Sequence, residues 1–65
     1  MPVYKNSDMR RVIDEYIHHP KHREVLRLRF CESLTYEEIA GEVNYSPQHV
    51  KSICRSNKAL LLSQL

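Results

Sequence analysis

Polar and cationic side chains recur at three- and four-residue spacing towards the C-terminal end of the chain. They are Gln48, Lys51, Ser52 and Arg55. In an α-helix this spacing places all of them on one face. Amide, hydroxyl and cationic groups can hydrogen-bond to base edges and neutralise phosphates, which is the chemistry of a DNA-contacting surface. The spacing therefore predicts a helix whose outer face could bind DNA.

A group of histidines raises the alternative of a metal site, because His18, His19 and His22 lie close together in the sequence. Imidazole is a good metal ligand. However, Pro20 interrupts the helical face between them, and no neighbouring cysteine or carboxylate completes a ligand set. We therefore expect a polar junction between two helices and no metal.

The residue types favour binding over catalysis. The chain has no glycine-rich phosphate loop, no paired carboxylates around a pocket and no recognisable nucleophile motif. Cys54 could have a lowered pKa beside Arg55, but a cysteine on the apolar stripe of a helix is more often a core residue. Together with Cys31 it lacks the short spacing of a zinc site, so both are expected to be reduced thiols near the core. We expect no enzymatic activity and no cofactor.

The stretch from Leu34 to Arg55 contains the elements that must position the polar face. Thr35 followed by Glu38 is a capping box, which predicts a helix start, and Leu34 before the cap could pack against Ile39. Asn44 stands where the chain must turn and tolerates a left-handed conformation.

A second helix start follows the turn at once. Ser46 is a good N-cap, and Pro47 suits the first helical position. Two short helices joined by a tight turn, the second with a polar outer face, form a helix-turn-helix.

Two further helices are expected before this pair, which makes the fold all-α, a four-helix bundle containing a helix-turn-helix. Apolar residues in the first recur at helical spacing, and the second carries an apolar arc broad enough to make it the central packing element. The expected elements are a flexible lead-in over residues 1–6, a helix from a cap at Asn6 or Ser7 to about His18, a helix over about Pro20–Glu32, the helix after Thr35, and a last helix over about Pro47–Leu62.

Arg29 is an exception on the apolar arc of the second helix, where an unpaired charge would be costly. We expect a carboxylate partner for it, Glu38 or failing that Glu37, joining the second helix to the third. The open alternative is that Arg29 extends to solvent or faces a phosphate.

Length and charge are consistent with one small domain over residues 1–65. A chain of 65 residues is near the lower limit for independent folding, and its 42% hydrophobic content suits a helical bundle. The net charge of +2 is small but uneven, because residues 46–65 contain three cations and no acidic residue. No apolar run could span a membrane, so we expect a soluble, cytoplasmic protein without a membrane partner.

Several blocks of the sequence resemble region 4 of bacterial sigma factors. The blocks are REVLRLRF at 23–30, LTYEEIA at 34–40, and Ser46, Val50 and Lys51. They are also similar to the LuxR-type helix-turn-helix, but the Tyr-Glu-Glu run after Thr35 favours the sigma domain. Region 4 recognises the −35 promoter element, so the resemblance implies a DNA-binding domain with the same four-helix plan.

The resemblance also implies which residues contact DNA. Base contacts would come from Pro47, Gln48 and Ser52, and phosphate contacts from Arg29 or Lys51 and from the start of the preceding helix. Gln48 could read adenine and Arg55 guanine or a phosphate, while His49 lies at the edge of the interface or on a solvent face. The candidate DNA-binding residues are Ser46, Pro47, Gln48, His49, Lys51, Ser52, Arg55, Lys58, Arg29, Thr35, Tyr36 and Glu37.

Two functions remain open. The chain resembles a detached region 4, since 65 residues have no room for the region that opens the −10 element. It could be a small phage or mobile-element regulator that binds double-stranded DNA, or one half of a split sigma factor. It could instead be an interaction module that binds RNA polymerase, or a sigma or anti-sigma partner, and redirects transcription. A homodimer through the first helix or through Leu60, Leu61, Leu62 and Leu65 is a further possibility.

Overall fold

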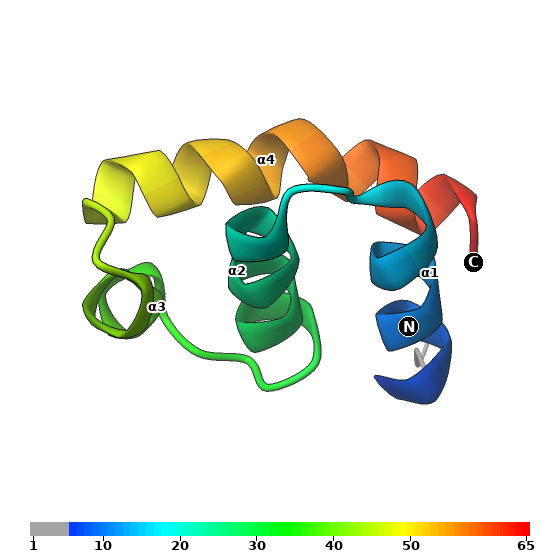
Figure 1. Cartoon of the computed structure of the whole chain (residues 1–65), viewed down its shortest axis with the longest axis horizontal. Coiled ribbons are helices and arrows are strands. Elements are labelled where there is room, and N and C mark those ends of the chain that lie inside the picture. Colours follow the sequence, from blue (N-terminus) through cyan, green and yellow to red (C-terminus); the bar gives the residue numbers. More distant parts are fainter. Residues whose placement is uncertain (1–5) are drawn as a thin grey trace.

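A computed structural model of the chain describes the backbone of residues 6–65 and the side chains from Ser7 onwards. The lead-in expected over residues 1–6 lies outside this range except for Asn6, at which the first helix begins. The described residues form four helices and no strand, which confirms the all-α fold (Figure 1). The helices are α1 (Asn6–Tyr16), α2 (Pro20–Phe30), α3 (Tyr36–Val43) and α4 (Pro47–Ser63).

Helix α2 is central, as expected, because it contacts each of the other helices. Helix α4, the longest, lies across α3, α2 and α1 in turn and so closes one side of the bundle (Figure 1). Helices α1 and α3 lie on opposite sides of α2 and do not contact each other. None of these helices, within residues 6–65, is long and apolar enough to cross a membrane.

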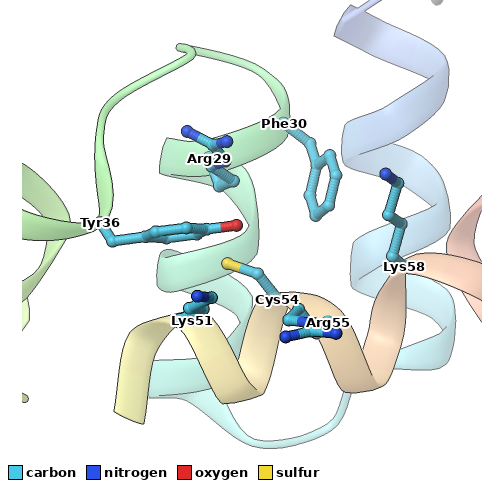
Figure 2. A pocket seen from close by; sticks show the side chains of 7 residues that line it. All are labelled: Arg29, Phe30, Tyr36, Lys51, Cys54, Arg55 and Lys58. Atoms are coloured by element: carbon cyan, nitrogen blue, oxygen red, sulfur yellow. The ribbon is translucent and has the colours of Figure 1, made fainter. Parts of the chain in front are cut away.

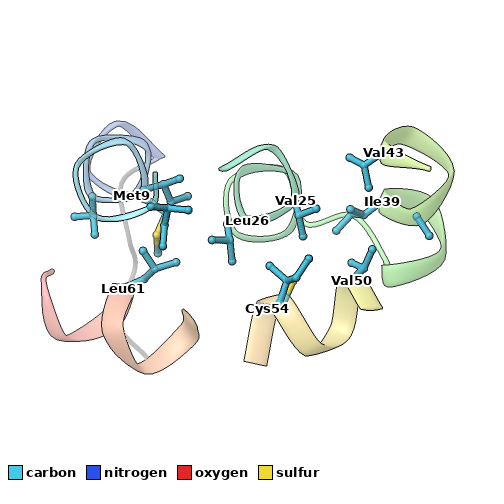
Figure 3. Packing of buried hydrophobic residues seen from close by; sticks show 13 residues of the cluster. Met9, Val25, Leu26, Ile39, Val43, Val50, Cys54 and Leu61 are labelled. Atoms are coloured by element: carbon cyan, nitrogen blue, oxygen red, sulfur yellow. The ribbon is translucent and has the colours of Figure 1, made fainter. Parts of the chain in front are cut away.

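The core is a continuous apolar cluster to which all four helices contribute (Figure 3). Each fully buried aliphatic side chain stabilises the fold by roughly 1.5–3 kcal/mol relative to its exposed state. Leu61 lies beside Met9, so the C-terminal end of α4 packs on α1 (Figure 3). The buried members are Met9, Val12, Ile13, Ile17, Val25, Leu26, Ile39, Ala40, Val43, Val50, Ile53, Cys54 and Leu61.

The junction between α1 and α2 is polar. Arg23 donates from Nε to the carbonyl of Ile17 and from Nη2 to the carbonyl of Asp14 at 2.9 Å, so its guanidinium satisfies carbonyls at the C-terminal end of α1. His19 caps α2, since its Nδ1 accepts a hydrogen bond from the backbone N–H of Lys21 at 3.2 Å, and Pro20 occupies the first turn. The histidines therefore lie at the expected helix junction.

The capping box predicted at Thr35 is confirmed. Thr35 Oγ1 accepts from the backbone N–H of Glu38 at 3.2 Å, and Glu38 Oε1 accepts from the backbone N–H of Thr35 at 2.9 Å. These bonds hold the pKa of the Glu38 carboxyl below its usual value. Leu34 is half-buried and packs against the core just before the cap, which fixes the angle at which the chain enters α3.

The turn between α3 and α4 also has the predicted geometry. Asn44 adopts the left-handed conformation, with φ 60° and ψ 35°. Ser46 caps α4, because its Oγ accepts from the backbone N–H of His49 at 3.1 Å, and Pro47 is the first helical residue. The helix-turn-helix is thus defined by local hydrogen bonds and one left-handed residue.

The carboxylate partner expected for Arg29 is wrong. Arg29 Nη1 donates to the backbone carbonyl of Leu34 at 2.9 Å, and its guanidinium lies 4.5 Å from the centre of the Tyr36 ring. Glu38 is engaged in the capping box, and Glu37 is exposed. A carbonyl and an aromatic face can stabilise a half-buried guanidinium that still reaches water, so the fold does not need an ion pair here.

Cys31 and Cys54 are not joined in a disulfide, as expected. Cys54 is only 3% exposed on the inner side of α4, and burial raises the pKa of its thiol although the charge of Arg29 acts in the opposite direction. Burial also raises the pKa of Cys31. A raised pKa lowers the thiolate fraction at neutral pH, so Cys54 has the character of a core residue, not of a nucleophile.

Candidate nucleic-acid interface

The predicted polar stripe lies on the outer face of α4. Gln48, Lys51, Ser52 and Arg55, together with Ser56, line a shallow hollow of about 330 Å³. All are exposed, because the opposite side of the helix is buried against α2 and α3. The spacing alone located four of these residues, and Ser56, four residues after Ser52, could have been found by extending the same stripe. We call this set the outer face.

The charges of the helix-turn-helix are distributed unevenly. Helix α4 contains no acidic residue, and its cations Lys51, Arg55 and Lys58 are all exposed. The acidic residues of α3 are also exposed. Glu37 and Glu38 lie in its first turn, where their negative charges interact favourably with the positive end of the helix dipole. A negatively charged partner would therefore meet favourable charge along α4 and unfavourable charge on α3.

Several other candidate residues hold the fold in place. The hydroxyls of Thr35 and Ser46 are engaged as N-caps. Pro47 and Glu37 are exposed. They line neither the hollow on the outer face of α4 nor a second hollow between α2, α3 and α4. Thr35 and Ser46 thus fix the positions of α3 and α4, whatever further contacts they make.

His49 belongs to an aromatic cluster at the start of α4 that was not predicted from the sequence. Its ring stacks on Tyr45 with centroids 4.4 Å apart, and Lys21 Nζ lies 5.3 Å from the centre of the Tyr45 ring. His22 stacks on His19 at 4.3 Å, and its pKa is lowered by burial and by the charges of His19 and His49. The four-residue interval from Tyr45 to His49 was the available signal.

A second hollow, of about 310 Å³, lies where the end of α2 and the start of α3 meet α4 (Figure 2). It brings together residues that are far apart in the sequence, including two that α4 also presents on its outer face. We call it the cationic pocket. It is lined by Arg29, Phe30, Tyr36, Lys51, Cys54, Arg55 and Lys58.

Three of the remaining candidates, Arg29, Tyr36 and Lys58, line this pocket. Arg29 and Tyr36, which were expected to contact phosphates, lie together in it, next to Lys51. Cys54 belongs to the core and Phe30 packs against it, and nothing in the residue types indicated that they also line a hollow.

Comparison with protein families gives a match to the family described as Sigma-70, region 4, over residues 19–57. This range covers more than half of the chain. The chain belongs to the sigma-70 region 4 family. Comparisons with curated proteins and with solved structures gave no significant match. The family is one of helix-turn-helix domains that bind DNA and RNA polymerase.

The region 4 match covers α2, α3 and α4 as far as Asn57. It therefore includes α2, α3, the turn after α3 and α4 up to Asn57, and it confirms the resemblance inferred from the sequence. Helix α1 and the segment from Lys58 onwards lie outside the matched range. Of the candidate DNA-binding residues, Lys58 alone falls outside it.

Proposed function

We propose that this region 4 domain is a small sequence-specific transcriptional regulator that binds double-stranded DNA through the outer face of α4. The observation that supports this most directly is an exposed stripe of hydrogen-bonding and cationic side chains on a helix without acidic residues. The inner side of the same helix is fixed by the core, so the stripe is presented on a rigid element.

The side chains of the outer face divide by chemistry. Gln48, in the first turn of α4, has both a donor and an acceptor and can pair with the major-groove edge of adenine. Lys51 and Arg55 carry the charges that neutralise backbone phosphates, and Arg55 can alternatively pair with guanine. Ser52 can donate to either a base or a phosphate. Readout of sequence therefore depends on few residues.

Binding of this kind should be sensitive to salt, because neutralised phosphates release counterions. The test is fluorescence anisotropy with a −35-like duplex and a random duplex. Lys51→Ala and Arg55→Ala should weaken binding to both duplexes. Gln48→Ala should instead reduce the preference between them, by about 1–3 kcal/mol if the pairing is bidentate.

A matched control for charge is Arg11→Ala, which removes one cation from the exposed surface of α1. It should leave both affinities nearly unchanged. Equal losses for Arg11→Ala and Lys51→Ala would show that only net charge matters and would remove the proposed interface.

A second candidate function is docking on RNA polymerase without productive DNA binding. Leu60 is 38% and Leu65 45% exposed at the C-terminal end, and Tyr16 at the end of α1 is 42% exposed. Such apolar side chains favour a protein partner, which could also be a second copy of the chain.

A pull-down of RNA polymerase from host lysate, compared with a gel shift on the two duplexes, separates the two functions. DNA binding without polymerase capture supports the regulator, and polymerase capture without DNA binding supports the interaction module. Sedimentation at micromolar concentration tests the dimer, because a species of monomer mass alone excludes a stable one.

A further inference from the structure

The cationic pocket contains four positively charged side chains and no carboxylate among its lining residues. Like charges gathered in one hollow repel each other, and the repulsion is relieved when an anion enters. A family of DNA-binding domains explains the cations on the outer face of α4. Arg29 and Lys58, which are also candidate DNA contacts, gather with two of these cations around a separate hollow.

Arg29 is the most organised of the four cations. It is half-buried, and it is oriented by its hydrogen bond to the Leu34 carbonyl and by the ring of Tyr36. A guanidinium has five N–H donors, of which this hydrogen bond uses one. No carboxylate among the described residues pairs with Arg29. A fixed guanidinium with free donors suits a phosphate, which it can bind in a bidentate manner.

The other three cations come from successive turns of α4. Lys51, Arg55 and Lys58 follow at four- and three-residue intervals, so they line one side of the pocket opposite Arg29 (Figure 2). Each is exposed, and none of their side chains makes a hydrogen bond among the described residues. They can therefore move towards a ligand without breaking an existing contact.

The pocket also has an apolar wall. The rings of Phe30 and Tyr36 lie within it, with the buried Cys54 on the α4 side (Figure 2). Apolar surroundings strengthen charge interactions relative to open water. The volume of about 310 Å³ lies at the lower end of the range of roughly 300–1,000 Å³ for small-molecule sites.

We propose that the cationic pocket binds a small oligophosphate, such as the phosphate chain of a nucleotide. Each phosphodiester of a DNA strand carries one negative charge, and successive charges are spread along the strand. An oligophosphate concentrates several charges in a few ångströms, which matches four cations around one hollow. The proposal does not depend on DNA binding. Because Lys51 and Arg55 belong to both surfaces, an occupied pocket competes with DNA for them.

The test is calorimetric titration of the full chain with inorganic triphosphate, compared with sulfate at equal ionic strength and without DNA. Triphosphate should bind at one site per chain and at least tenfold more tightly than sulfate. Lys58→Gln should weaken it about three- to fivefold, since it removes one charge contact at a partly exposed site. Arg11→Gln removes the same charge elsewhere and should change the affinity by less than a factor of two.

Two results would overturn the proposal: triphosphate binding no tighter than sulfate, or equal losses in Lys58→Gln and Arg11→Gln. Circular dichroism of both variants confirms folding, and Lys51→Gln replaces Lys58→Gln if the latter is unfolded.

A DNA titration in saturating triphosphate then tests the shared residues. Weaker DNA binding supports the competition, and unchanged DNA binding contradicts it. A chain that binds triphosphate but no DNA retains the pocket and loses the proposed function.

Discussion

The inner and outer sides of α4 differ in almost every physical property. On the inner side Val50 and Leu61 are 0% exposed and Ile53 is 5% exposed. On the outer side Lys51 and Arg55 are exposed and make no hydrogen bond within the described residues. The residues that hold α4 in the fold are therefore separate from those that are available to a partner. Substitutions on the two sides should therefore affect different measurements.

The largest effect is expected on the inner side. Ile53→Ala should lower the free energy of unfolding by about 2–5 kcal/mol, because it removes buried apolar surface and leaves a cavity. A domain of this size has a low free energy of unfolding, so this variant should be unfolded in a large fraction of the molecules. Urea denaturation followed by circular dichroism measures the change.

The matched change on the outer side is Ser52→Ala, which should alter the free energy of unfolding by less than about 0.5 kcal/mol. Similar losses for Ile53→Ala and Ser52→Ala would contradict the separation of the two sides.

Intermediate effects are expected at the caps that orient α3 and α4. Thr35→Ala and Ser46→Ala should each cost about 1 kcal/mol, because each leaves a backbone N–H of the first turn without its partner. The same denaturation experiment applies. Thr35→Gly and Ser46→Gly serve as controls and should cost only a few tenths of a kcal/mol relative to the wild type. If the alanine variants were as stable as the wild type, the caps would not define the helix starts.

A smaller effect is expected from His22. Burial, followed by the charges of His19 and His49, lowers the pKa of this imidazole in the folded chain from 6.5. Protonation therefore favours the unfolded chain. The contribution is fully present above pH 6.5, is lost as the pH falls from there to the folded-state pKa, and does not change further below it.

Thermal melts between pH 7.5 and pH 5 can isolate this contribution, with His22→Gln as the comparison. The variant should lose less stability than the wild type over this range. An identical pH dependence in the two proteins would show that His22 does not contribute. Protonation of Glu38 acts only at more acidic pH, because its folded-state pKa is lowered by the capping box.

Local features of the fold could be predicted from the sequence. The capping box at Thr35, the left-handed Asn44 and the cap at Ser46 each depend on residues within a few positions of one another. The helix limits were less accurate, since α1 ends at Tyr16 and α2 at Phe30, both two residues before the expected ends. Helix ends depend on which carbonyls find other partners, and Arg23 supplies these for α1 from the next helix.

The partner of Arg29 and the cationic pocket could not be predicted in the same way. A backbone carbonyl gives no signal in the residue types, so the contact of Arg29 with Leu34 was not foreseen. The pocket needs the end of α2, the start of α3 and the middle of α4 at fixed distances, which only the packed bundle determines. The outer face was located because a single helix carries it.

We propose that the outer face of α4 binds DNA while the inner side maintains the fold. The most direct test measures the affinity for a −35-like duplex from about 50 to 200 mM salt, a range that exposes phosphate contacts, in the wild type and in a Lys51→Ala/Arg55→Ala double variant. We predict weaker binding and a salt slope reduced in magnitude by about 1.8, or 0.9 for each lost phosphate contact, with the free energy of unfolding nearly unchanged. Equal affinities and slopes in two folded proteins would show that the outer face of α4 does not bind DNA.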